Sequence, residues 1–173
     1  MQCVLSAGDV ILSIWEGTKR LTLKRALGLP LFVIITLTLV AAGHPALNLG
    51  NQRAHATSEQ TVVTAEADTW VRSTHADRNY GNHTYLHIDN DPEMSTYLRF
   101  DVPEIDGTLV SATLELHAEA SHRRGFSVRA VEQTDWDEHA LTYANAPAYS
   151  SEVLAESGPY DAGSTVRVDL THA

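Results

Sequence analysis

The stretch Leu109–Glu119 (LVSATLELHAE) decides the fold class of this chain. Its apolar and polar residues alternate without a break. One face carries Val110, Ala112, Leu114, Leu116 and Ala118, and the other carries Ser111, Thr113, Glu115, His117 and Glu119. A period of two residues is typical of a β-strand with one buried face and one face in water. We therefore expect a strand here that belongs to a half-buried sheet.

Shorter stretches on both sides show the same alternation. They are Thr61–Ala65 and Ala67–Arg72 (two strands, or one interrupted at Glu66), Tyr85–Asp89, Thr96–Val102, Phe126–Val131, Val153–Ala155 and Thr165–Leu170. Turn-forming residues separate them, as in His75–His83 and Asn90–Glu93. Short antiparallel strands spaced by turns predict an all-β protein with two packed sheets, a β-sandwich.

The amino-terminal segment has a different character. Four cations, Lys19, Arg20, Lys24 and Arg25, precede an 18-residue uncharged run, Ala26–Gly43. This order is typical of a signal peptide, and the length is close to that of a membrane-spanning helix. Ala54-His55-Ala56 supplies a pattern suited to cleavage. We expect a hydrophobic helix that acts as a cleaved signal peptide or an uncleaved anchor, with the rest of the chain outside the cell.

The predicted organisation is thus a targeting segment and linker over residues 1–56, followed by a β-sandwich module over residues 57–173. The last apolar strand residue, Leu170, lies three residues before the end of the sequence. A sandwich that stops there is left with an unpaired edge, which favours association. We expect the module to be carboxy-terminally incomplete.

Charge and cysteine content exclude several function classes. From Thr57 onward, twenty acidic residues stand against seven arginines, a net charge of −13 with histidine neutral. Such a surface repels nucleic acid and anionic lipid. The single cysteine, Cys3, excludes an internal disulfide and any zinc site built on cysteine. The expected partners include no nucleic acid, and include a membrane only through the amino-terminal anchor.

Five ordered motifs resemble a known family. They are Ala67–Arg72 (ADTWVR), Asp77–Gly81 (DRNYG), Tyr97–Asp101 (YLRFD), Val110–Leu114 (VSATL), and Thr134–Trp136 (TDW) with Leu141–Pro147 (LTYANAP). Together they resemble the DNRLRE domain, also grouped as carbohydrate-binding module family 96. The resemblance covers roughly Ala65–Leu170. Trp70 stands where tyrosine is commoner in the family, and Tyr143-Ala144 stands where Trp-Asn is usual.

The resemblance implies a jelly-roll sandwich on extracellular proteins, often beside polysaccharide lyases. It also implies binding of a polysaccharide, in some members an acidic, alginate-like one. Because folds host many functions, this is inference by family and not from a site. Two alternatives stay open: a structural or adhesive surface domain without a glycan site, and a remnant of a polysaccharide lyase.

The outward-facing residues of neighbouring strands predict a ligand-binding surface. Aromatic rings stack on sugar rings, and arginine pairs bidentately with a uronate carboxylate. The alternative is an ordinary wet sheet face whose cross-strand pairs stabilise the fold. The candidate ligand-binding residues are Tyr85, His87, Tyr97, Arg99, His117 and Arg129. For Trp136, in an irregular segment, we favour packing under a loop over stacking on a sugar.

Oxygen donors gather near two turns and predict a Ca²⁺ site, because Ca²⁺ prefers six to eight oxygen ligands. The candidate metal ligands are Asp68, Asp77, Asn79 and Asp89. The alternative is that Asp and Asn simply form the turns. For catalysis, no nucleophile with a base and no distinct carboxylate pair stands out, so we expect no enzyme.

Overall fold

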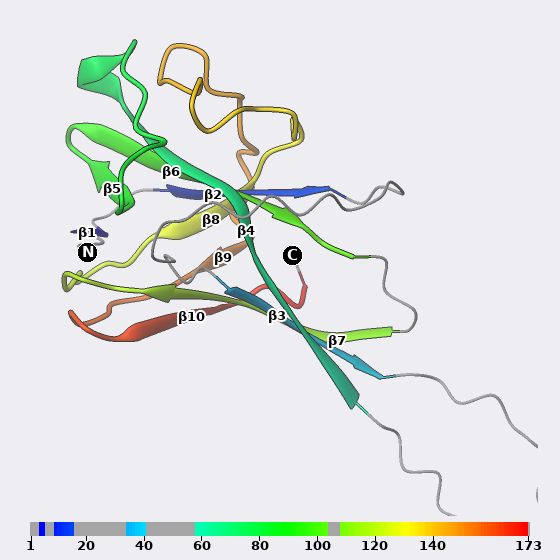
Figure 1. Ribbon diagram of the computed structural model, residues 1–173. Coiled ribbons are helices and arrows are strands. Elements are labelled where there is room, and N and C mark those ends of the chain that lie inside the picture. The colour runs from blue at the N-terminus through cyan, green and yellow to red at the C-terminus, as the bar shows by residue number, and fades with distance from the viewer. Residues whose placement is uncertain (1–3, 6–8, 16–33, 41–57, 104–107, 173) are drawn as a thin grey trace, which may run out of the picture.

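The computed structural model describes residues 4–5, 9–15, 34–40, 58–103 and 108–172, and these are almost entirely β structure (Figure 1). One 3₁₀ turn, η1, spans Ser73–His75. The strands are β1 (Val4–Leu5), β2 (Asp9–Trp15), β3 (Ile34–Val40), β4 (Ser58–Arg72), β5 (His87–Asn90), β6 (Glu93–Asp101), β7 (Thr108–His117), β8 (Ser127–Ala130), β9 (Ala155–Glu156) and β10 (Thr165–Asp169).

Hydrogen bonding orders the strands β10-β7-β3-β4-β6-β2-β8-β9, with β5 added beside β6 and β1 beside β5. Strand β4 belongs to both halves of this order. Its residues 58–64 pair with β3, and its residues from Ala65 onward pair with β6, with a register shift between Ala65 and Ala67. A bulge bends and twists a strand, and Figure 1 shows β4 running from the β3–β7–β10 layer to the β5–β6 layer.

The main core lies between these two layers. Leu114 and Leu116 of β7 and Val168 of β10 belong to the same buried cluster as Leu98 and Phe100 of β6. Leu98, Phe100 and Leu114 are completely buried. From Ala112 onward in β7, the face that alternation predicted as inward is therefore the face that packs. Val110, placed on the same face, is 48% exposed.

The all-β class with antiparallel sheets is confirmed, but the jelly-roll sandwich is not, and β2 pairs in parallel with β6 and β8. Most predicted strands lie where expected, although β9 includes only Ala155 of the stretch Val153–Ala155. The predicted strand over Leu109–Glu119 is β7, and the interrupted pair before Arg72 is the single bulged strand β4. The predicted amino-terminal helix is not confirmed. Residues 34–40 of the apolar run form strand β3, and the remainder of the run lies outside the described residues.

Within the described part of the chain, no helix is long and apolar enough to cross a membrane.

Candidate functional site

Residues 131–150, here called the covering segment, lie over the outer face of the β4–β6 sheet. An isolated bridge between Val131 and Tyr149 closes the segment at its base. A second buried cluster joins the segment to the sheet: Ala67, Val71 and Tyr97 from the strands, with Val131, Trp136 and Leu141. The outer face of this sheet is therefore a second core, and the predicted packing role of Trp136 is confirmed.

Two outward-facing residues of β6 hold the covering segment in place. The Tyr97 hydroxyl donates a buried hydrogen bond to the carbonyl oxygen of Pro147 at 3.1 Å. Arg99 Nη1 donates to the carbonyl oxygens of Thr134 (3.1 Å) and Trp136, and its guanidinium lies 5.1 Å from the centre of the Trp136 ring. Because these bonds satisfy carbonyls of an irregular segment, they fix its path.

Asn79 and Gly81 attach the covering segment to the loop after β4. Asn79 Nδ2 donates to the carbonyl oxygens of Glu138 (2.6 Å) and Leu141 (2.7 Å), and its Oδ1 accepts from Gly81 N–H at 3.1 Å. The backbone of Gly81 lies so close to Glu138 that a Cβ at position 81 would be 2.0 Å from the Glu138 carbonyl oxygen. The Asp77–Gly81 motif therefore has a structural role here.

An open groove of about 390 Å³ lies beside this attachment. Its lining comes from β4, from the end of β6 and from the start of the covering segment. Among the residues whose side chains the structure describes, the lining residues are Glu66, Arg99, Phe100, Asp101, Thr134 and Asp135. Phe100 belongs to the main core and has no exposed surface, so the chemistry of the groove rests on the other five.

The groove combines one cation with three carboxylates and a hydroxyl. Arg99 Nε forms an ion pair with Glu66 Oε2 at 3.3 Å, and Arg99 Nη1 donates hydrogen bonds to the covering segment. Within the described residues Arg99 Nη2 has no partner, and the exposed side chains of Asp101 and Asp135 have none either. Guanidinium donors beside carboxylate acceptors suit a ligand with many hydroxyl groups, because each hydroxyl both donates and accepts.

The six residues predicted to bind ligand do not share one open surface. Tyr97 lies beneath the covering segment and is 3% exposed. Arg99 reaches the groove. Arg129 Nη1 donates to the carbonyl oxygen of Ser150 at 3.3 Å, which ties down the far end of the covering segment. His117, exposed at the end of β7, lies 3.9 Å from the Glu119 carboxylate.

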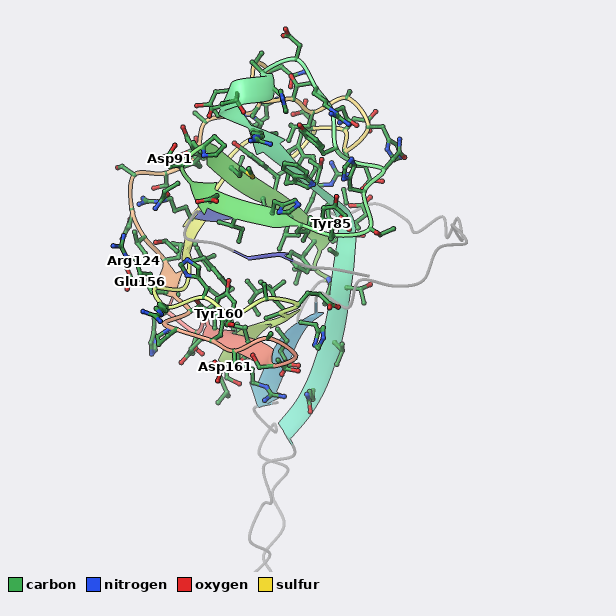
Figure 2. The ribbon with its side chains drawn as sticks, turned by 90° about the vertical axis from the view of Figure 1, so that its left-hand side faces the viewer. Tyr85, Asp91, Arg124, Glu156, Tyr160 and Asp161 are labelled. Carbon is green, nitrogen blue, oxygen red and sulfur yellow. The ribbon has the colours of Figure 1, made fainter. Side chains whose placement is uncertain are left out.

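Tyr85 and His87 lie together in an aromatic cluster. Their ring centres are 4.8 Å apart, and His87 packs edge-on against Trp70 at 4.5 Å. Trp70 in turn stacks on Tyr80 at 3.7 Å. Tyr85 is half-buried against the main core, and Figure 2 shows it in the β5–β6 half of the molecule, away from Tyr160 of the other layer. Its role in binding stays a prediction.

The four residues predicted as metal ligands lie in different surroundings and make different hydrogen bonds. Asn79 holds the covering segment, and Asp89 Oδ1 accepts hydrogen bonds from the N–H groups of Asn90 and Asp91, as in an Asx turn. Asp77 is exposed. Among the residues that the structure describes, no three His, Cys, Asp or Glu side chains are grouped to hold a metal ion. Calcium binding stays a prediction.

Asp68, the fourth of these residues, lies against a second carboxylate. Its backbone N–H donates to Glu138 Oε2 at 3.0 Å, and Glu138 Oε1 is 3.2 Å from His139 Nε2. Burial of the Asp68 carboxyl, with the nearby Glu138 charge as a second cause, raises its pKa from 3.8 to about 6. Ionised Asp68 therefore destabilises the fold at neutral pH.

We expect Asp68→Asn to stabilise the protein at pH 7.5 by about 2 kcal/mol. Because the pKa is higher in the folded state than in the unfolded one, the carboxyl favours folding fully below pH 4. That contribution disappears as the pH rises through about 6. Urea unfolding at pH 7.5 and at about pH 3, below the pKa of both states, measures the difference, which should vanish at the lower pH. Equal effects at both pH values, or an equal gain from Asp77→Asn on the exposed surface, would contradict this account.

The fold is an all-β module with antiparallel sheets, and the groove gives it a polar surface. The chain belongs to carbohydrate-binding module family 96, whose model matches residues 59–173. Membership identifies the matched region as a carbohydrate-binding module, a class of non-catalytic domain, and confirms the resemblance found in the motifs.

A curated relative gives a second comparison. A gellan lyase from Bacillus sp is 28% identical to this chain over 131 residues, which is 71% of this chain. The chain spans only 5% of the length of that lyase. No solved structure matches.

Sequence reasoning found one polar groove residue, Arg99, and missed the other four: Glu66, Asp101, Thr134 and Asp135. Thr134 and Asp135 lie in the TDW motif, so the motif itself was a signal. Strand alternation placed Asp101 on the outer face of β6 together with Arg99. No periodic pattern, however, indicated that the irregular segment would return to this strand.

Proposed function

We propose that this protein is an exported, non-catalytic module that binds polysaccharide in the groove beside Arg99. The observation that carries the proposal is the convergence of Arg99, Thr134 and three carboxylates on an open groove in a member of a carbohydrate-binding family. Export is supported by the cationic stretch and apolar run before residue 44, and the relative named as a gellan lyase supports a carbohydrate as the class of ligand.

The charges of the groove favour sugar hydroxyls over sugar carboxylates. A uronate group would gain the Nη2 edge of Arg99 but would face Glu66, Asp101 and Asp135. The three carboxylates repel the negative charge of a uronate and oppose its binding, and added salt would weaken this repulsion. We therefore expect neutral sugar units to occupy the groove. An acidic, alginate-like glycan would bind with Arg99 as its main contact, and added salt would weaken that contact while it relieves the repulsion from the carboxylates.

A glycan array with the purified protein tests the proposal. The array should carry neutral and uronate-containing polysaccharides, each probed at low and physiological ionic strength. The expected result is retention of at least one polysaccharide, with catalytic conversion of none. Failure to retain any of them would contradict the proposed function.

We predict that Asp101→Asn with Asp135→Asn reduces affinity for a retained neutral glycan about tenfold. Each carboxylate is a strong hydrogen-bond acceptor for sugar hydroxyls, and a bond to a charged group contributes about 1.5–3 kcal/mol. Both side chains are exposed, so the fold should be unaffected. Isothermal titration calorimetry measures the change.

The matched control is Asp161→Asn, an exposed carboxylate in the connection between β9 and β10, labelled in Figure 2. This connection contributes nothing to the lining of the groove. Its variant should bind like the parent protein. An affinity loss in the control equal to that in the double variant would show that the overall charge matters and the groove does not.

One observation favours a second candidate, a structural surface domain without a glycan site. The motif residues Asn79, Gly81 and Tyr97 all attach or support the covering segment. A family pattern made of such residues preserves a fold without specifying a ligand. The array distinguishes the two, because only the first candidate retains a polysaccharide.

A further inference from the structure

Strand β3 occupies a central place in the sheet. It pairs antiparallel with β4 from Ile34↔Thr64 to Val40↔Ser58, and with β7 from Ile34↔Glu115 to Val40↔Thr108. Without β3, the first half of β4 and most of β7 would each present an unpaired row of N–H and C=O groups. Such edges recruit other strands.

The sequence of β3, IITLTLV, suits this place. Ile34, Ile35, Thr36, Thr38 and Val40 are β-branched, and branching at Cβ favours extended backbone. From Ile35 to Leu39, apolar and threonine residues alternate, which is the pattern of a strand with two different faces. The same residues lie within the uncharged run that resembles an export signal, so two roles compete for them.

We propose that the gap between β4 and β7 is a strand-acceptor site, and that residues 34–40 of the same chain remain in the mature protein as its occupant. The proposal rests in part on the proposed export. A cut at Ala54-His55-Ala56 would remove β3 from the module, so processing must leave Ile34 and the residues after it attached. The expected domain boundary at residue 57 lies between β3 and its two pairing partners, β4 and β7. A module that begins at residue 57 would therefore lack β3.

Engineered disulfides in the full chain test where residues 34–40 lie. Thr36 is the Cα partner of Thr113, and facing residues on antiparallel strands are about 4.5–5.5 Å apart, within the reach of a disulfide. In a Cys3→Ser background, Thr36→Cys with Thr113→Cys should form an intrachain disulfide. The control pair, Thr36→Cys with Arg167→Cys on β10, has β7 between its two strands and should not form one.

Three outcomes would overturn the proposal. A disulfide that links two chains on a non-reducing gel would mean that a second copy supplies the strand. Equal yields in the test pair and the control pair would mean that β3 has no fixed register. An intact mass showing that the exported protein begins after Val40 would mean that the strand is removed. Glycan retention on the array is measured separately, so a failure here leaves the proposed function standing.

Discussion

Replacing Gly81 with alanine is expected to lower the free energy of unfolding by about 3 kcal/mol, at the upper end of the cost of overpacking. The added Cβ would be 2.0 Å from the carbonyl oxygen of Glu138 and 2.6 Å from its carbonyl carbon. Both are backbone atoms, so a change of side-chain rotamer cannot relieve the clash. The covering segment must move, and the bonds from Asn79 to it lengthen. Urea unfolding followed by tryptophan fluorescence measures the loss.

Gly163→Ala is the matched control. Gly163 has a φ of +75° but open space where the Cβ would lie. Alanine there meets backbone strain alone, which costs about 1 kcal/mol. If the two variants lose equal stability, the close approach of Gly81 to Glu138 is not what requires glycine.

Replacing Asn79 with aspartate is expected to cost about 3 kcal/mol or more at neutral pH. The substitution puts an oxygen in place of Nδ2, which donates to the carbonyl oxygens of Glu138 and Leu141. Both carbonyls lose a donor and face a negative charge, and an unsatisfied buried group costs about 1–3 kcal/mol. Equilibrium unfolding at pH 7 measures the change.

Asn82→Asp, three residues away, introduces the same charge at an exposed position. It should change stability by no more than about 0.5 kcal/mol, as is usual for surface substitutions. The Asn79→Asp loss should also shrink at pH 3, where a protonated carboxyl donates one hydrogen bond again. A loss that is the same at both pH values would show that the amide donor is not the important group.

The strands could be predicted from the sequence because a sheet with one buried face has a period of two. In β7, burial alternates from Ala112 to Leu116, as the pattern indicated. Strand β3 was predicted as a helix because length and hydropathy were weighed above its β-branched residues. Its pairing partners, β4 and β7, lie far away in the sequence, and no local signal indicates them.

The candidate site was less accessible to sequence reasoning. Alternation correctly placed Tyr97 and Arg99 on the outer face of β6, but outward does not mean exposed when another segment covers the sheet. The covering segment has no periodicity, and its path depends on single contacts such as Arg99 with Trp136. Asn79 was predicted as a metal ligand for its oxygen, yet it is the amide nitrogen that makes the long-range contacts.

The proposed binding of glycan in the groove beside Arg99 is tested most directly by a titration of ¹⁵N-labelled protein with an oligosaccharide from a polysaccharide that the array retains. We expect the largest chemical-shift changes at the Arg99 Nε–H and at the amides of Asp101, Thr134 and Asp135. Changes gathered at Tyr85 and His87, with these groove signals unmoved, would contradict it.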